Sequence, residues 1–533
     1  QCRRPAKLYL RTMGRGSASA DTDDRSRAIA RAVFITGRDA QSLSSQGVVH
    51  DGGDMSFLIV LAALCFLMFV AYRGYSVILF APIAALGAVL LTDASLVAPM
   101  FTGLFMDKMV GFLKLYFPVF LLGAIFGKLI ELSGFSKSIV SAVIRLFGAE
   151  RAMLSIVAVC AVLTYGGVSL FVVVFAVYPF AAELFRQSDI PKRLIPGTIA
   201  LGAFTFTMDA LPGTPQIQNI IPTSFFGTTT WAAPWLGTIG AVFILILGMS
   251  YLEWRRRTAK RNGEGYGDAA TLLNEPAAFV DGKLAHPLLA LTPLVLVGVV
   301  NKLLTLWIPQ VYGSSHEFVP AVIGKAAPVV QEVSKIAAIW SVQGALLVGI
   351  ASVIVLAWRP VAASFAEGAK HAIGGAMLAA MNTASEYGFG AVIAALPGFL
   401  VVANALQSIP NPLVNEAITV TALAGITGSA SGGMSIALAA MAETFIVNAN
   451  AAGIPMDVLH RVASMASGGM DTLPHNGAVI TLLAVTGLTH RQAYKDIFAI
   501  TLIKTGAVFV IIGAFYATGL VCGARTASPE TIR

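Results

Sequence analysis

Apolar runs of about 20 residues, the length that a helix needs to cross a bilayer, recur along this chain. The plainest are 56–72, 75–91, 235–252, 288–308, 336–358 and 501–520. They predict an all-α protein built as a polytopic bundle of about 10–12 helices. The composition points the same way, because only 12% of the 533 residues are charged, whereas soluble proteins carry about 25%.

A basic run divides the chain in two. Residues 254–286 begin with an Arg- and Lys-rich stretch and continue as polar sequence, which is typical of a cytoplasmic loop. We therefore expect a first membrane half at 55–253, a basic linker at 254–286, a second half at 287–520 and a polar tail at 521–533. Residues 1–54 are polar, and we expect them either to precede the natural start at Met55 or to be disordered.

A similar unit occurs once in each half, at 164–212 and at 431–474. Each copy opens on a Gly-Gly-x-Ser break, passes an Ile-Pro link and closes on Met-Asp-x-Leu-Pro. Two copies predict a protein made of two repeats. The first link carries three basic residues and the second only Arg461. This difference favours opposite orientations in the membrane, that is, inverted repeats.

A polar, glycine-bearing interruption precedes each unit, at 117–134 and within 373–403. Backbone can leave the helical conformation inside a membrane only where protein or water satisfies its polar groups. We therefore expect each half to contain a re-entrant hairpin followed by a broken helix. The tip of the second hairpin would hold Asn382, Thr383, Ser385 and Glu386.

The glycine breaks predict an anion site. A helix that starts after a break directs unpaired N–H groups and the positive end of its dipole at the gap. The alternative is that these small residues only let helices pack closely. The candidate substrate-binding residues are Gly166, Gly167, Ser169, Thr214, Gln216, Asn382, Thr383, Ser385, Ser429, Ser431, Gly432, Gly433, Ser435 and Asn476.

Two acids lie in matching apolar surroundings, Asp209 and Asp471. A charge at the centre of a spanning helix costs about 2.5–3.5 kcal/mol on insertion scales, so such residues usually serve an ion, a proton or a substrate. Each could instead cap the helix that follows it. His475 is of the residue type that exchanges protons near neutral pH. We expect Asp209, Glu386, Asp471 and His475 to carry the coupled proton.

Several function classes lack their motifs. The sequence contains no phosphate loop, nucleophile elbow or His-Glu-x-x-His. We therefore expect no catalytic residue, metal or cofactor, and a driving force from an ion gradient. The net charge of +8 is attributed to cytoplasmic loops and not to nucleic-acid binding, and four scattered cysteines do not predict a disulfide framework. A membrane-embedded transferase and a channel are the alternatives, but a duplicated unit favours a carrier.

The ordered set of motifs resembles the gluconate permease (GntP) family of the ion-transporter superfamily. The resemblance covers about 55–520 and rests on Gly166-Gly167, Ile190-Pro191, the Pro-rich segment 211–215 and the segment Thr472–Asn476. It implies two inverted repeats in the bacterial inner membrane, a proton-coupled importer of a small organic anion, and a homodimer with an elevator-like transport domain.

Asp209 and Asp471 depart from the sugar-acid members of that family. The expected substrate therefore shifts to 3-hydroxybutyrate, with gluconate and related hydroxy acids next. A citrate or dicarboxylate carrier coupled to Na⁺ or H⁺ is the alternative.

Overall fold

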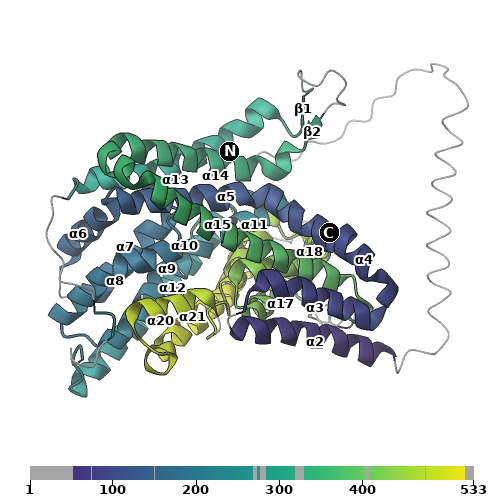
Figure 1. The fold of residues 1–533 in the computed structure, drawn as a ribbon, viewed down its shortest axis with the longest axis horizontal. Coiled ribbons are helices and arrows are strands. Elements are labelled where there is room, and N and C mark those ends of the chain that lie inside the picture. Colours follow the sequence, from purple (N-terminus) through teal and green to yellow (C-terminus); the bar gives the residue numbers. More distant parts are fainter. Residues whose placement is uncertain are drawn as a thin grey trace, which may run out of the picture.

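The structure is a computed structural model that describes residues 52–521 except 74, 149–150, 268–272, 276–283, 319–328, 400, 402–408 and 475. Most of this part of the chain is helical, and its helices pack into one bundle (Figure 1). The regular strands found there are β1 (His316–Phe318) and β2 (Val329–Gln331), which pair antiparallel. The predicted all-α polytopic bundle is confirmed. Residues 1–51 and 522–533 lie outside the described residues.

Six described helical segments are long and apolar enough to cross a membrane. They are Ala94–Leu132, Pro234–Arg261, Pro287–Tyr312, Val333–Leu356, Ala430–Ala451 and His490–Thr518. Shorter apolar helices accompany them at Met55–Leu67, Val77–Thr92, Ala152–Tyr165, Pro412–Thr427 and Gly477–Thr486. The chain is therefore a multi-pass membrane protein.

The first half runs from α2 to α12. Its helices are α2 (Gly52–Tyr72), α3 (Val77–Thr92), α4 (Val97–Pro99), α5 (Met106–Leu132), α6 (Phe135–Phe147), α7 (Ala152–Tyr165), α8 (Leu170–Gln187), α9 (Ile195–Ala203), α10 (Phe206–Asp209), α11 (Ile217–Phe226) and α12 (Pro234–Arg261). Short 3₁₀ turns at Ala94–Leu96 and Lys192–Leu194 and a π-helical turn at Met100–Phe105 join them. The basic run 255–261 forms the C-terminal end of α12.

The second half runs from α13 to α21. Its helices are α13 (Pro287–Tyr312), α14 (Val333–Leu356), α15 (Trp358–Ala394), α17 (Pro412–Thr427), α18 (Ala430–Ala451), α19 (Met456–Ser467), α20 (Gly477–Thr486) and α21 (His490–Thr518). Local sequence sets several of these ends. Asn411 accepts hydrogen bonds from the backbone N–H groups of Leu413 and Val414 at the start of α17, and Gly428, at φ 64°, ends that helix.

The order of elements repeats between the halves. In the first half α5 precedes the pair α7 and α8, the interrupted helix α9–α10–α11, and then α12. In the second half α15 precedes the pair α17 and α18, the interrupted helix α19–α20, and then α21. The contacts are reciprocal, because α11 packs on α18 and α20 packs on α8, while α12 packs on α21. A two-fold relation between halves produces contacts of this kind. The opposite orientation of the repeats in the membrane stays a prediction.

The expected positions of the re-entrant hairpins are wrong. Residues 117–132 belong to the continuous helix α5, and residues 373–394 belong to the continuous helix α15. Glycine inside a helix costs only about 1 kcal/mol relative to alanine, so Gly123 and Gly127 do not interrupt α5. The chain turns back instead between α17 and α18, and α7 packs on α8 in the same way in the first half.

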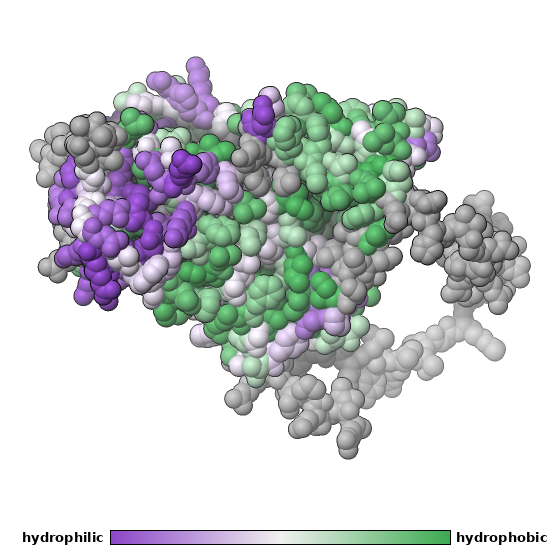
Figure 2. All heavy atoms as spheres, turned by 90° about the horizontal axis from the view of Figure 1, so that it is seen from below, coloured by the Kyte–Doolittle hydropathy of each residue, from purple (hydrophilic) through white to green (hydrophobic). Residues whose placement is uncertain are grey.

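Hydrophilic residues gather toward one end of the face seen in Figure 2, and hydrophobic residues cover most of the remainder. On α13 the exposed side chains of Leu288, Val295, Val299, Leu303 and Leu306 recur at helical spacing. A soluble protein rarely exposes an apolar stripe of this length. We attribute it to contact with lipid.

Candidate functional site

The first interrupted helix is broken at 210–216, which we call the first break. Pro212 and Pro215 lie in this segment and lack the N–H groups that would continue a helix. Asp209 is the last residue of α10 and is 1% exposed. Its Oδ1 atom has no hydrogen-bond partner among the described residues. The break therefore holds a buried acid with unused acceptor capacity.

The second interrupted helix is broken at 468–476, the second break. Asp471 lies within it and is 4% exposed. Lys504 of α21, also buried, forms an ion pair with Asp471 Oδ1 and donates a second hydrogen bond to Phe204 O at 3.2 Å. Because Phe204 follows α9, the Lys504 ammonium joins the second break to the first interrupted helix.

The two breaks face each other. A Cβ atom at Gly468 would lie 2.0 Å from Asp209 Oδ2, so only glycine lets the carboxylate approach the second break this closely. On α19, Ser464 Oγ and Arg461 Nη1 donate to Asp209 O at 2.8 and 2.9 Å. The structure thus gathers Asp209, Arg461, Asp471 and Lys504, which we call the central cluster.

Sequence reasoning missed Lys504. The residue stands alone in the apolar run 501–520, which we expected to be a plain span. A lysine in an apolar span is as costly as an aspartate, so it is an equally strong signal of function.

Arg461 was misread as a loop residue that reports orientation. It is fully buried in α19, where its guanidinium donates to Ala232 O, Asp209 O and Asn219 Oδ1. These acceptors come from the first half, so Arg461 ties the halves together. The link that it was assigned to, 452–455, contains no basic residue. Arg186 likewise lies in α8, so the first link keeps Lys192 and Arg193 against none in the second, and the contrast remains two basic residues.

The first glycine break forms a turn between α7 and α8, at Gly166–Ser169, which we call tip 1. Gln216 Nε2 of the first break donates to Thr164 O at 2.7 Å and to Val168 O at 3.2 Å. A Cβ atom at Gly167 would lie 3.1 Å from Pro215. Gln216 therefore holds tip 1 against the first break, and Thr214 Oγ1 is buried nearby in the sequence without a partner among the described residues.

The second turn, tip 2, lies at Gly428–Ser429. Asn476 Nδ2 of the second break donates to Gly428 O at 2.7 Å, and its Oδ1 caps α20 through Val479 N. Gln216 and Asn476 thus play equivalent parts, each holding the hairpin tip of its own half. Ser429 Oγ caps α18 through Gly432 N.

The second glycine interruption was expected at 428–433, and the turn of tip 2 lies at the start of that stretch. The part of the prediction that placed the interruption at Gly432-Gly433 is wrong. Both glycines lie inside α18, and a Cβ atom at Gly433 would lie 2.2 Å from Ala424 Cα. Close packing of α18 on α17 explains this glycine, which is the alternative that the sequence left open.

The first turn of α18, which follows tip 2, rests on the polar stretch 382–386 of α15. A Cβ atom at Gly432 would lie 1.6 Å from Glu386 Oε2, an atom without a hydrogen-bond partner among the described residues. Thr383 Oγ1 lies 3.3 Å from Ser431 Oγ. The hydroxyls of Ser385 and Ser435 are buried and unpartnered within the same part of the chain, and Asn382 is half-buried.

The structure does not merge all predicted residues into one pocket. No hydrogen bond within the described ranges joins tip 1 to tip 2, and tip 1 meets Gly127 of α5 where tip 2 meets Glu386 of α15. His475 lies outside the described residues. The expected roles of these residues in binding substrate or protons stay predictions.

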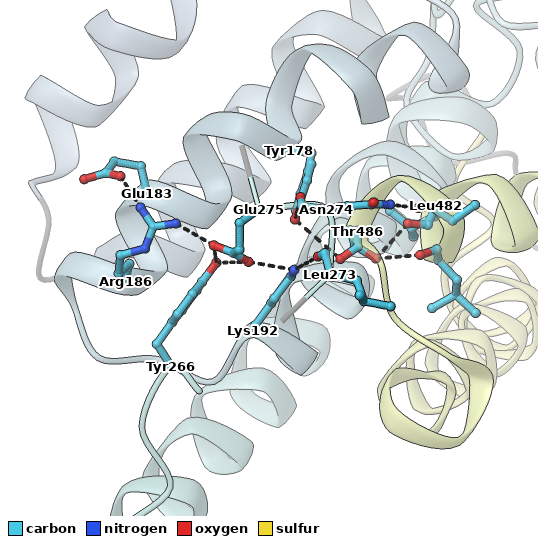
Figure 3. A network of polar contacts seen from close by, with 12 residues as sticks. Tyr178, Glu183, Arg186, Lys192, Tyr266, Leu273, Asn274, Glu275, Leu482 and Thr486 are labelled. Atoms are coloured by element: carbon cyan, nitrogen blue, oxygen red, sulfur yellow. Dashed lines mark hydrogen bonds and ion pairs between the residues drawn. The ribbon is translucent and has the colours of Figure 1, made fainter. Parts of the chain in front are cut away.

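A second polar network joins the halves at the end where α12 terminates (Figure 3). Glu275 of the linker pairs with Lys192 at 2.7 Å and with Arg186 at 2.5 Å. Asn274 Nδ2 donates to Ala484 O of α20 at 2.7 Å. Burial raises the pKa of the Glu275 carboxyl, but hydrogen bonds from Lys192 and Arg186 outweigh it and leave the pKa below its usual value.

Interrupted helices that face each other around buried charges, within a bundle of apolar helices, define a class of protein, the helical membrane transporters. The comparisons agree. The chain is 61% identical over 474 residues to the protein named uncharacterized transporter YxjC of Bacillus subtilis (strain 168), a match that covers 88% of this chain and all of that one. The chain belongs to the family of YxjC and is a transporter.

Two other comparisons concern solved structures and protein-family models. The structure resembles the crystal structure of the Alcanivorax borkumensis YdaH transporter, with a TM-score of 0.42 and 15% identity over 80% of this chain and 90% of that one. No protein-family model matches the sequence.

Proposed function

We propose that this protein is a secondary transporter that imports a small organic carboxylate together with a proton across the bacterial inner membrane. The candidate substrates are 3-hydroxybutyrate first, then gluconate and related hydroxy acids. The proposal extends to kinship with the gluconate permeases and to a homodimer, both of which rest on the resemblance in sequence motifs.

The observation that carries the proposal is the central cluster. Two acids, one from each half, lie at facing helix breaks with a lysine and an arginine, all at most 4% exposed. Charges buried in this way cost several kcal/mol each unless they are paired, so a purely structural protein gains little from them. A transporter needs such groups, because a proton or an anion must exchange partners inside the bundle.

The balance of charge favours a proton over Na⁺. The Lys504 ammonium occupies the position between Asp471 and Phe204 O that a coupling cation would need. A citrate or dicarboxylate carrier coupled to Na⁺ stays the second candidate, because Glu386 and the hydroxyls around tip 2 are oxygen groups of the type that hard cations prefer.

Uptake into proteoliposomes tests the proposal. The purified full chain is reconstituted and given labelled 3-hydroxybutyrate, gluconate or citrate under an imposed pH gradient, an imposed Na⁺ gradient or neither. We expect accumulation of a monocarboxylate that depends on the pH gradient and not on Na⁺. Uptake of citrate driven by Na⁺ alone would favour the second candidate, and uptake that ignores both gradients would reject symport.

A further inference from the structure

We propose that Lys504 binds the carboxylate of the transported acid and that its ion pair with Asp471 is the device that couples the acid to the proton. The inference rests on the proposed function and deepens it. It assigns the anion to a residue outside the predicted sites and the coupled proton to one acid of the central cluster.

Lys504 has one donor that its partners among the described residues do not use. Its ammonium has three N–H groups. The described residues account for two of them, through Asp471 Oδ1 and Phe204 O. In the same cluster Asp209 Oδ1 has no partner within the described part of the chain. The junction of the two breaks therefore offers a donor to a carboxylate and an acceptor to a hydroxyl, which is the combination that a hydroxy acid presents.

Of the two cations in the central cluster, Lys504 is the one that can leave its partner. Arg461 is not available, because its guanidinium is committed to Ala232 O, Asp209 O and Asn219 Oδ1. Those bonds also satisfy the carbonyl groups of Asp209 and Ala232, and an unsatisfied buried acceptor costs about 1–3 kcal/mol. Lys504 is held mainly by Asp471, whose charge a single proton removes.

The charges of the central cluster rearrange when the proton and the acid bind, which we call loading. A proton forms an O–H bond on the Asp471 carboxylate and breaks its ion pair with Lys504. The ammonium keeps its own protons and pairs with the carboxylate of the arriving acid. Before loading the Lys504 ammonium is paired with the Asp471 carboxylate, and afterwards it is paired with the carboxylate of the acid. Proton and anion therefore enter together without a change in the net buried charge. On the other side the proton leaves, Asp471 takes Lys504 back and the acid is released.

Other titratable groups lie on the elements packed around Asp471. Asp209 on α10 is one of them, and its carboxylate lies against Gly468 of the second break. Lys504 and Arg461 are the cations of the same cluster. The remaining ones lie on the described parts of α19, α21 and the elements packed on α10, α19 or α21. They are Cys160 and Tyr165 on α7, Lys192 and Arg193 on the turn before α9, Tyr251, Glu253, Arg255, Arg256, Arg257, Lys260 and Arg261 on α12, Glu416 on α17, Glu443 on α18, Asp457 and His460 on α19, and His490, Arg491, Tyr494, Lys495, Asp496 and Tyr516 on α21. Among these, Asp496 is already paired with Arg255, and His460 is hydrogen-bonded to Thr228 and Asn219.

Binding as a function of pH tests the inference. The acid used is the one of 3-hydroxybutyrate, gluconate and citrate that the wild-type protein takes up, and binding is measured on the purified full chain between pH 5.5 and 8.5. Wild-type affinity should fall with rising pH by up to about tenfold per pH unit, the limit for one coupled proton. Asp471→Asn should bind the acid independently of pH and exchange it across the membrane, but fail to accumulate it under a pH gradient.

Removing the lysine should have a different effect. Lys504→Met should weaken binding at every pH by at least about tenfold, the loss expected for one charge-assisted hydrogen bond. Either single variant leaves a buried charge unpaired and so risks misfolding. The double variant Asp471→Asn, Lys504→Met removes both charges, and it should fold but bind no acid.

The control is Glu264→Gln, which breaks an ion pair with Arg193 far from the cluster in sequence and should keep wild-type pH dependence. Wild-type pH dependence in Asp471→Asn, or wild-type affinity in the double variant or in Lys504→Met, would overturn the inference. Failure of the wild-type protein to bind or take up any of the three acids would instead reject the proposed function.

Discussion

At the scale of single residues, three glycines mark close approaches of side chains and backbone around the breaks and tip 2. Gly468 admits the Asp209 carboxylate, Gly432 admits Glu386, and Gly433 admits the backbone of α17. Other glycines on the long helices, such as Gly374 and Gly375 on α15, have no atom within 4 Å of an added Cβ. The distinction lets small substitutions probe the buried acids without touching their charges.

Gly432→Ala should displace Glu386 from tip 2. The added Cβ would lie 1.6 Å from Glu386 Oε2 and 2.9 Å from Ser429 Oγ, so the end of the flexible Glu386 side chain must move away. We expect uptake in proteoliposomes to fall at least about tenfold, the effect of losing about 1.4 kcal/mol of interaction at this carboxylate.

Gly375→Ala is the matched control, because the same methyl group meets open space on α15. It should leave uptake unchanged. Equal uptake by both variants would show that the position of Glu386 at tip 2 is irrelevant to transport.

At the scale of elements, each hairpin tip is tied to the break of its own half by one side-chain amide. Gln216 serves tip 1 and Asn476 serves tip 2. Movement of a tip and movement of a break are therefore linked within each half. In the first half Gln216 donates to two carbonyl groups, and in the second half Asn476 donates to one.

Asn476→Asp should separate the two tasks of this residue. Aspartate still caps α20 through Val479 N, but it loses the N–H donor to Gly428 O. We expect amide hydrogen exchange to become faster around 424–433, consistent with the loss of about 1 kcal/mol for one hydrogen bond, while α20 stays protected.

Asn411→Asp is the control. The hydrogen bonds described for the Asn411 side chain cap α17 through Oδ1, an atom that aspartate retains. Its exchange pattern should match that of the wild type. Unchanged exchange around tip 2 in Asn476→Asp would mean that the amide tie contributes nothing to its order.

Glu275 predicts a pH dependence of stability outside the membrane-spanning segments. The pKa of its carboxyl is lowered in the folded protein, so its contribution is fully present above its unfolded pKa and is lost as the pH falls through the lowered value. Glu275→Gln should reduce the free energy of unfolding at pH 7 by about 1.5–3 kcal/mol, the range for hydrogen bonds to charged groups.

Thermal unfolding of wild type and Glu275→Gln from pH 7 to pH 3 measures this effect. The difference between them should shrink below about pH 4.5. Glu332→Gln, which removes an exposed pair with Lys335, should show no difference at any pH. A gap between wild type and Glu275→Gln that stays constant with pH would contradict the assignment.

At the scale of the whole molecule, two polar networks join the halves. The central cluster joins the breaks, and the network of Figure 3 joins the linker to α20. Because α13 follows the linker as a long apolar helix, the two ends of α13 should lie on opposite sides of the membrane.

Single cysteines, introduced after the four native cysteines are replaced by serine, test this arrangement. Arg257→Cys places a thiol at an exposed position of the basic end, and Glu317→Cys places one on the exposed strand β1. An impermeant thiol reagent added to intact cells should label position 317 and spare position 257 until the cells are opened. The reverse pattern would invert the predicted orientation.

The sequence predicted the fold class and the two Asp-bearing breaks, because proline, glycine and acid within an apolar run each disfavour an uninterrupted helix. It misplaced the hairpins for two reasons. Glycine costs a helix only about 1 kcal/mol, so Gly123 and Gly127 do not interrupt α5. The polar run of α15 is accommodated by packing against α18, which local sequence does not reveal. Lys504 was missed for a related reason. Its partner, Asp471, lies 33 residues away, and the surrounding span is apolar.

Arg461 has a consequence for how the chain is made. The carbonyl oxygens of Asp209 and Ala232 belong to the half that leaves the ribosome first, yet the guanidinium that satisfies them follows 252 and 229 residues later. At synthesis rates of about 5–20 residues per second, the newly inserted first half waits about 10–50 s with these groups bare. During biogenesis, that interval exposes the nascent protein to quality-control proteases, and a fragment that ends before α19 should be degraded rather than accumulate.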